Sequence, residues 1–308
     1  MANKQPSDYT TASLPSLPLE EWEDSKITLH LYLQIIGKIR LALMPPLNHW
    51  WHVPLYLTSR GLTTRPIPYG DFVFEISLDF IGHTLLLTTS RGGQQEIALR
   101  GQPVADFYAE LTAALDRNGI AVDISPQPFD HPSTIPFPED TQHKAYDPDY
   151  IHRYWTVLLF GHTVLTEFAG RFVGKCTPIH LFWHSFDLAY TRFSGREAPA
   201  LTEAGQVARE AYSHEVISFG FWAGDDKLRE PAFYSYTYPE PPDLRAQPIS
   251  PDFAYWVEQN GGSLAILPYR QLREADSPRV VLLNFLESAY QAGARQAGWD
   301  IEQLTLKR

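Results

Sequence analysis

The stretch HWWHVPLYLTSR, residues 49–60, decides the fold because its Trp-His pair returns later in the chain. The second pair stands 132 positions further on, from Trp51 to Trp183, and at the same offset Arg60 falls on Arg192. Tryptophan and histidine are uncommon residues, so this self-similarity indicates one structural unit used twice. We therefore expect Trp51 and Trp183 to occupy equivalent positions.

The first half of the chain has the pattern of a helix, a run of strands and a second helix. Apolar residues at helical spacing predict a helix over 19–43, and a proline pair ends it. A helix over 104–118 closes the half, and Gly119 stops it. The strands expected between these helices, with glycine-containing reversals after the second and third, are 51–58, 72–80, 84–90 and 94–99.

The second half repeats this order with insertions. A helix is predicted over 149–173, after a capping Asp-Pro pair, and another over 279–297 stops at Gly298. The inserted residues lie mainly at 194–213 and 239–253. The strands expected here are 179–193, 215–222, 232–238 and 264–267, with an additional one over 254–257.

These elements predict an α+β fold of two pseudo-twofold-related α-β-β-β-β-α repeats with antiparallel sheet, forming one compact body. The expected parts are a flexible tail (1–17), a first repeat (18–124), a proline-rich connector (125–148) and a second repeat with insertions (149–308). Because exposed sheet edges attract pairing, the two sheets should meet edge to edge or pack face to face. A ligand would lie in the cleft between the repeats.

Composition restricts the class of protein. The 308 residues are 44% hydrophobic and 20% charged, as in a chain with a full core, and the net charge is −11. No basic patch is visible, so we expect no nucleic-acid partner. The polar first residues and the absence of long apolar runs argue against a secretory signal or a membrane span. A single cysteine, Cys176, excludes an internal disulfide, and we expect a cytoplasmic protein.

Metal and cofactor chemistry find little support in the motifs. If 179–193 is one strand, His180 and the histidine four residues later lie roughly 13 Å apart, too far to share one zinc ion. A metal would need histidines from separate strands, such as His52, His180 and His214. The lone cysteine follows a lysine that would favour a thiolate, although a buried packing role is commoner. No phosphate-binding loop is present, so no cofactor is expected.

Two expected strands each carry a histidine and an arginine that are separated by an even number of positions. His180 and Arg192 share a face of the expected strand 179–193, and His52 and Arg60 share one in the first half. Arginine offers a planar pair of donors, so a cleft with these residues would suit an anionic or carboxylate-bearing ligand. The alternative is packed histidines and surface arginines. Because a straight strand would separate His180 and Arg192 by roughly 40 Å, we expect His180 alone to contact the ligand.

Further candidates lie on neighbouring segments. His214 and Glu215 enter a strand after an insertion, but adjacent strand residues point to opposite faces, so they cannot act as a pair. The run 233–238 places three tyrosines on one face, which is typical of a ligand wall and also of a half-buried edge strand. Asp187 adds a carboxylate on the strand that carries His180.

Longer motifs carry a family resemblance. They are PPLNHWWHVPLY, GLTT-x-PIPYG, FVGKC-x-P-x-H-x-FW, SFDLAYTRFSGR, AYSHEV and PAFYSYTYPEPP. From about Leu19 to Trp299 the chain resembles a widespread bacterial family of uncharacterised proteins, a domain of unknown function. The resemblance implies a soluble bacterial protein of this size and no established activity. His184 departs from the family pattern, which has glycine there, and this moves the expected site to His180. The positions that match are His49, His52, Lys175, Cys176, His180, Asp187, Arg192, Arg196, His214 and Glu215.

The favoured hypothesis is a metal-independent enzyme or small-molecule binding protein with a cleft between the repeats. One alternative is a non-catalytic protein that binds another protein through its proline-rich insertion at 239–251 and its aromatic surface. Another is a metal-dependent enzyme with histidines from separate strands. The oligomeric state stays open. The expected ligand-binding residues are His52, His180, Arg192, His214, Asp187 and Glu215.

Overall fold

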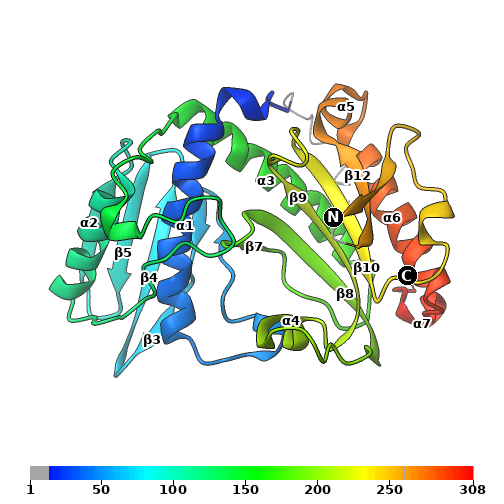
Figure 1. The fold of residues 1–308 in the computed structure, drawn as a ribbon, viewed down its shortest axis with the longest axis horizontal. Helices are drawn as coiled ribbons and strands as arrows, with labels where there is room; N and C mark the ends of the chain where they lie inside the picture. Colours follow the sequence, from blue (N-terminus) through cyan, green and yellow to red (C-terminus); the bar gives the residue numbers. More distant parts are fainter. Residues whose placement is uncertain (1–13, 260, 308) are drawn as a thin grey trace, which may run out of the picture.

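The computed structural model describes residues 14–259 and 261–307, which form two antiparallel sheets and their helices (Figure 1). The first half contains η2 (Leu19–Glu21), α1 (Glu23–Leu43), η3 (Asn48–Trp50), β1 (Tyr56–Leu57), β2 (Gly61–Thr63), β3 (Ile67–Tyr69), β4 (Phe72–Asp79), β5 (Thr84–Thr89), β6 (Gln94–Ala98) and α2 (Val104–Arg117). The second half contains η4 (Phe137–Glu139), α3 (Pro148–Ala169), β7 (His180–Phe182), β8 (Asp187–Glu197), α4 (Gln206–Ala211), β9 (His214–Trp222), β10 (Ala232–Tyr238), η5 (Leu244–Ala246), β11 (Tyr255–Gln259), β12 (Gly262–Pro268), α5 (Tyr269–Glu274), α6 (Pro278–Gln296) and α7 (Ile301–Leu304). The predicted α+β class is confirmed.

The two sheets meet edge to edge. The first has the order β1-β2-β4-β5-β6, with β3 also paired to β4, and the second has the order β7-β8-β9-β10-β12-β11. At their junction Leu55 and Leu181 exchange two backbone hydrogen bonds of 2.9 and 2.8 Å. This bridge satisfies backbone groups that each edge would otherwise expose.

The predicted equivalence of the two Trp-His pairs is wrong. Trp51 lies in the turn before β1, whereas Trp183 lies in the turn between β7 and β8. The indole of Trp183 donates to the carbonyl of Val53 at 3.1 Å, so the second motif packs on the first instead of copying it. The strand orders differ as well, because β12 lies between β10 and β11. The two halves have in common only the succession of a helix, an antiparallel sheet and a closing helix.

The segment expected to form one strand over 179–193 is a hairpin. Between β7 and β8 the chain reverses, and Phe186 takes a left-handed φ of 60°. His180 consequently pairs with Ala189 on β8. Arg192 stands three residues beyond Ala189, and an odd spacing along a strand places it on the opposite face. The prediction that His180 and Arg192 share a face is therefore wrong.

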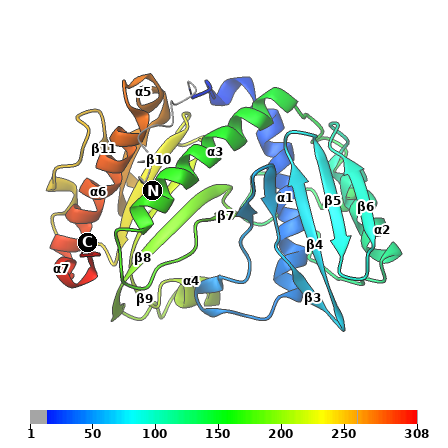
Figure 2. The ribbon, with the colours of Figure 1, turned by 180° about the vertical axis from the view of Figure 1, so that it is seen from behind.

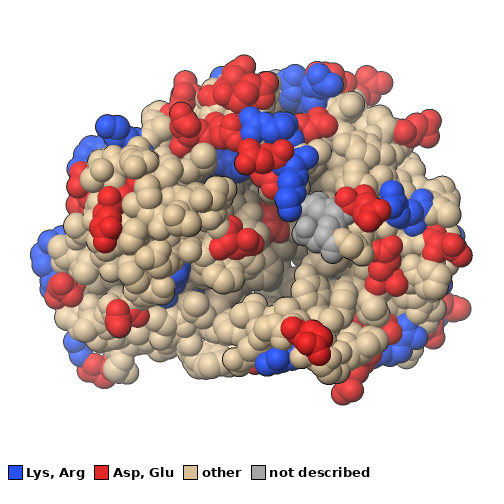
Figure 3. Space-filling model, in the orientation of Figure 1, with Lys and Arg blue, Asp and Glu red and all other residues tan. Residues whose placement is uncertain are grey.

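The helices cover the two sheets from opposite sides. In Figure 1, α1 and α2 lie in front of the first sheet, whereas α3 and α6 lie behind the second, and Figure 2 shows the reverse. The front of the second sheet has α1 along one side and α4 at its lower end, and we call it the open face. Figure 3 shows a hollow near the middle of this side of the molecule. Residues of the open face are His180, Phe182, Asp187, Ala189, Thr191, Ser218, Gly220, Tyr234 and Tyr236.

Two boundaries follow from local backbone chemistry. The helices α2 and α6 end as predicted, because Gly119 and Gly298 take positive φ values of 71° and 64°.

The expected tail over 1–17 is too long, because Leu14 and Leu17 are buried, and residues 1–13 lie outside the described residues.

The connector over 125–148 is fastened to α1. Gln34 exchanges two hydrogen bonds of 2.9 and 2.8 Å with the backbone of Phe129. The Lys38 ammonium donates to the carbonyls of Ser125 and Gln127. These bonds hold the connector against the side of α1 that borders the open face. Across the part of the chain that the structure describes, the helices are too short or too polar to cross a bilayer.

Candidate functional site

Basic side chains gather at the junction of β1 and β7. The guanidinium carbons of Arg40 and Arg65 lie 5.5 and 3.5 Å from the centroid of the Tyr56 ring. His180 packs edge-on against the same ring at 6.3 Å. His52 lies just before β1, and burial together with the nearby charge of Arg40 lowers its pKa. We call Arg40, Arg65, Tyr56, His180 and His52 the junction cluster.

Local backbone structure explains how the two arginines reach Tyr56. Arg40 lies near the end of α1, is 4% exposed, and donates to the carbonyl of Thr64. Arg65 follows in the turn after β2 with a left-handed φ of 58°, and its backbone N–H donates to the Thr63 hydroxyl at 2.7 Å. This uncommon conformation turns the exposed side chain of Arg65 back over the ring.

The junction cluster has a surplus of positive charge. Within residues 14–259 and 261–307, neither Arg40 nor Arg65 forms an ion pair with a carboxylate. The Nε of Arg40 and the Nδ1 of His180 are buried without a hydrogen-bond partner in the described part of the chain. Burial, and then the charges of Arg65 and Arg40, lower the pKa of His180 to about 3, so the ring is neutral at pH 7. A buried cation without a counter-charge, as Arg40 is here, is costly, and an anion would offset that cost.

A ladder of rings leads from the junction cluster along the edge of the open face. His180 and Phe182 lie 4.6 Å apart between ring centroids, and Phe182 and His184 lie 5.2 Å apart. At its end, the Asp187 carboxylate accepts hydrogen bonds from the hydroxyls of Ser185 and Tyr234. The ladder therefore links the basic junction to a hydrogen-bonded carboxylate.

Gly220 makes room for the side chain of Tyr234 to reach Asp187, which lies two strands away. Tyr234 stands on β10, and its ring crosses Gly220 of β9 towards β8. A methyl group on Gly220 would overlap this ring and the backbone of Leu188. The glycine is therefore required by a close approach of side chain and backbone.

Hydroxyl groups continue across the open face beyond Tyr234. The Tyr236 ring stacks beside it, with centroids 6.3 Å apart and planes inclined by 13°. Tyr236 and Tyr212 share a hydrogen bond of 3.1 Å, and Thr191 and Ser218 share one of 2.7 Å. The face thus offers aromatic surfaces and polar groups side by side.

A second basic group lies beside α4, where η3 packs against that helix. The Lys175 ammonium lies 2.7 Å from the Nε2 of His49, and the His49 ring meets that of His214 at 5.3 Å. Burial lowers the pKa of both Lys175 and His49. His49 and Trp50 have left-handed φ values of 54° and 60°, a strained pair for residues other than glycine.

The structure distributes the sequence-predicted residues over several places. His52 and His180 enter the junction cluster, while Asp187 and His214 lie on or at the end of the open face. Arg192 lies on the helix-covered face of the same sheet, where it donates to the carbonyl of a residue in α3. Glu215 is engaged elsewhere, in a 2.7 Å ion pair with Arg196.

Sequence reasoning missed Arg40 and Arg65. A signal for Arg40 was available, because it interrupts the apolar residues of the predicted helix 19–43. Arg65 carried no comparable signal, since its role depends on a left-handed turn and on a ring nine positions earlier.

The metal hypothesis required histidines from separate strands. Among the described residues, no three His, Cys, Asp or Glu side chains converge in a way that could hold a metal ion, and His52, His180 and His214 do not form such a group. Cys176 is half-buried, and its backbone bridges to that of Arg192.

Comparison with known proteins identifies the family of the chain, and the function of that family is unknown. The model of DUF5996, a family of unknown function, matches residues 14–306. The chain belongs to this family. Searches of curated proteins and of solved structures each find no significant match. The resemblance seen in the sequence motifs is therefore confirmed as to family.

Proposed function

We propose that this DUF5996 protein binds a small anionic ligand at the junction cluster. The observation that carries the proposal is the pair Arg40 and Arg65, which lie over one Tyr56 ring without a carboxylate partner among the described residues. Two guanidinium groups offer planar donor pairs that suit a carboxylate or a phosphate. Neutral His180 adds one more donor at the same place.

The open face supports a ligand with a polar organic body. The ring ladder from His180 to His184 and the hydroxyls of Tyr234 and Tyr236 give aromatic and hydrogen-bonding surface next to the charge site. Sites for small molecules commonly combine such aromatic walls with a few polar groups. The charge site would fix one end of the ligand, and the open face would hold the rest.

Calorimetric titration with succinate and with inorganic phosphate tests the proposal. Arg65→Gln is the informative variant, because the side chain is exposed and its loss should leave the fold intact. We expect at least about tenfold weaker binding of the preferred anion, which corresponds to about 1.4 kcal/mol. Arg100→Gln removes a surface arginine that pairs with Glu110, and it should bind as the wild type does. Equal affinities of Arg65→Gln and the wild type would refute the proposal.

The pH dependence of binding gives a second test. A bound anion stabilises the protonated form of His180 and so raises the low pKa of this ring. Affinity should therefore increase as pH falls from 7 to 5, since binding becomes coupled to proton uptake. His180→Gln should flatten that slope. The same slope in the variant and the wild type would exclude His180 from the site.

A further inference from the structure

The second region of interest is Arg192, on the face of the second sheet that α3 and α6 cover. Its side chain is 1% exposed, and its guanidinium carbon lies 3.5 Å from the ring centroid of Phe168, 4.5 Å from that of Tyr290 and 4.8 Å from that of Phe172. One terminal nitrogen donates to the carbonyl of Phe168 at 2.6 Å. Its Nε has no hydrogen-bond partner among the residues that the structure describes. Aromatic faces offset part of the cost of a buried cation, but they do not satisfy its donors.

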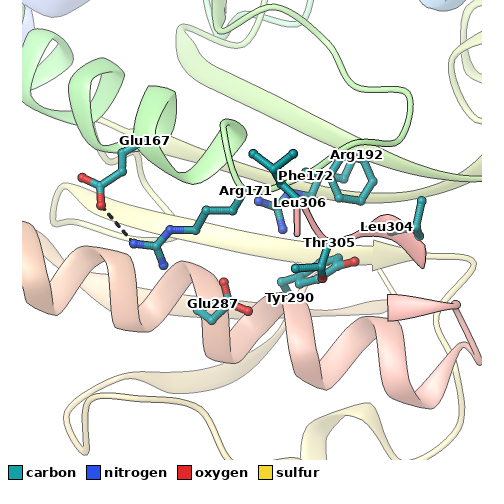
Figure 4. A pocket seen from close by; sticks show the side chains of 9 residues that line it. All are labelled: Glu167, Arg171, Phe172, Arg192, Glu287, Tyr290, Leu304, Thr305 and Leu306. Carbon is teal, nitrogen blue, oxygen red and sulfur yellow. Dashed lines mark hydrogen bonds and ion pairs between the residues drawn. The ribbon is translucent and has the colours of Figure 1, made fainter. Parts of the chain in front are cut away.

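A cavity of about 440 Å³ opens beside this guanidinium (Figure 4). Phe172, Arg192 and Tyr290 line it, and the hydroxyl of Tyr290 is likewise buried without a hydrogen-bond partner among the described residues. The volume lies within the range of small-molecule sites. Two residues with an unsatisfied polar atom therefore line the cavity, which points to a ligand with hydrogen-bonding atoms there.

The chain segment after α7 closes one side of the cavity. Thr305 bridges to Phe172, and the backbone N–H of Leu306 donates to the backbone carbonyl of Arg171 at 3.0 Å. Leu304 and Leu306 both line the cavity. They supply apolar surface next to the ring of Phe172.

The charges at the other side of the cavity differ from those at Arg192. Glu167 is already paired, because it binds both Arg171 and Arg279. Glu287 accepts a hydrogen bond of 3.0 Å from Gln291 and forms no ion pair with the described residues. The cavity therefore presents an unpaired guanidinium and an unpaired carboxylate, which do not pair with each other.

We propose that this cavity binds a free α-amino acid with an apolar side chain. The ligand carboxylate would accept from Arg192 and Tyr290, the ammonium would face Glu287, and the side chain would pack on Phe172 and Leu304. A zwitterion satisfies both unpaired charges at once, whereas a simple anion or a simple amine satisfies one. The site is independent of the junction cluster, because Arg192 lies on the opposite face of the sheet.

Titration calorimetry with L-leucine and L-phenylalanine tests this proposal on the full chain. Each amino acid is compared with the analogue that lacks its amino group (4-methylpentanoate or 3-phenylpropanoate) and with the amine that lacks its carboxylate (isoamylamine or phenethylamine). We expect saturable one-to-one binding of an amino acid and at least tenfold weaker binding of both analogues. No saturable binding of either amino acid, or equal binding of an analogue, would overturn the proposal.

Variants identify the two charged ends. Glu287→Gln, at a half-buried position, should weaken amino-acid binding at least tenfold and leave binding of the carboxylate analogue unchanged. Glu302→Gln, an exposed change on α7 outside the cavity lining, is the matched control and should bind as the wild type does. Arg192→Met should abolish binding. Should Arg192→Met fail to fold, the analogue series and Glu287→Gln still decide, because wild-type affinity in Glu287→Gln contradicts the proposed site.

Discussion

The two sheets each have one face without a helix layer of its own, and these faces differ in character. On the first sheet, Glu75, Ser77 and Asp79 alternate with buried residues along β4, and the face is a plain solvated one. On the open face of the second sheet, Tyr234 and Ser218 are buried although no helix of that sheet lies over them. Side chains there fill the surface by lying across neighbouring strands.

The face of the first sheet is an ordinary solvated surface, whereas the open face of the second sheet has the features of a binding site. A solvated antiparallel face needs only polar residues at alternate positions, and its hydroxyls and carboxylates can bind water. A face in which Tyr234 crosses Gly220 to reach the half-buried carboxylate of Asp187 depends on particular partners at fixed positions. Substitutions should therefore have large effects on the open face and small ones at matched positions of the first sheet.

Acid should produce the largest effect, and it should act through His180 on the open face and through His30 on α1, whose ring nitrogen lies 3.1 Å from the backbone carbonyl of His184 at the edge of that face. Burial first of all lowers the pKa of His30 and of His180 to about 3 each, against about 6.5 in an unfolded chain. Between these values the unfolded state binds more protons, so this stability is complete above pH 6.5 and is lost as pH falls towards 3. Each histidine should lower the unfolding free energy by up to about 1.4 kcal/mol per pH unit.

Urea unfolding at pH 7, 6, 5 and 4 measures this slope. His30→Gln should make it shallower, because a residue that titrates only in the unfolded state has been removed. His152→Gln, at an exposed position of α3, is the control and should keep the wild-type slope. Parallel curves for His30→Gln and the wild type would contradict the expectation.

Gly220→Ala should destabilise the protein by about 2–3 kcal/mol, because the added methyl overlaps the Tyr234 ring and the Leu188 backbone. The matched change on the first sheet is Thr88→Ala on β5, which should alter stability by less than about 0.5 kcal/mol. Chemical denaturation of both variants gives the comparison. Similar losses would mean that the two faces are equally tolerant and would remove the distinction between them.

Asp187→Ala should cost about 2 kcal/mol, because the buried Tyr234 hydroxyl loses a charged acceptor. Glu75→Ala is an informative counterpart, since Glu75 also accepts from two hydroxyls, those of Thr63 and Ser77. On the solvated face water replaces the carboxylate, and the expected cost is below about 1 kcal/mol. The measurement is again equilibrium unfolding, and a reversed order of the two variants would break the comparison.

Ion pairs near the ends of the sheets should give the smallest effects, and equal ones. Arg196 pairs with Glu215 in the second half, and Arg60 pairs with Asp79 in the first, with about half or more of each arginine side chain exposed. Arg196→Gln and Arg60→Gln should each cost at most about 1 kcal/mol, and less at high salt. A large loss in Arg196→Gln alone, measured by thermal unfolding at low and high salt, would show that the hydrogen bonds of Arg196 to the carbonyls of Ala297 and Gly298 contribute more than the ion pair.

Local patterns were sufficient to predict most elements. The helices over 104–118 and 279–297 have boundaries within one residue of α2 and α6, because an apolar stripe begins each and a glycine ends it. The strand over 232–238 coincides with β10. In contrast, the short strands β2 and β3 were missed, since two or three residues carry no measurable alternation.

The site was only partly predictable, for a geometric reason. His52 and His180 were expected at a shared cleft, and both lie in the junction cluster, but their expected role in binding stays a prediction. The predicted position of Arg192 relative to them was wrong. The aromatic-rich segment contains a turn, and after this turn each side chain points to the face opposite to the one expected for a continuous strand.

The sequence by itself determined the α+β class, the helix ends and the family, because these depend on composition and on spacing between near neighbours. Only the tertiary structure decided that the sheets join at Leu55 and Leu181, and that Arg40 and Arg65 meet over one ring. It also decided that Arg192 faces a cavity behind the sheet. Such contacts join residues far apart in the chain, and their geometry depends on strand register and turn handedness, which single residues do not encode.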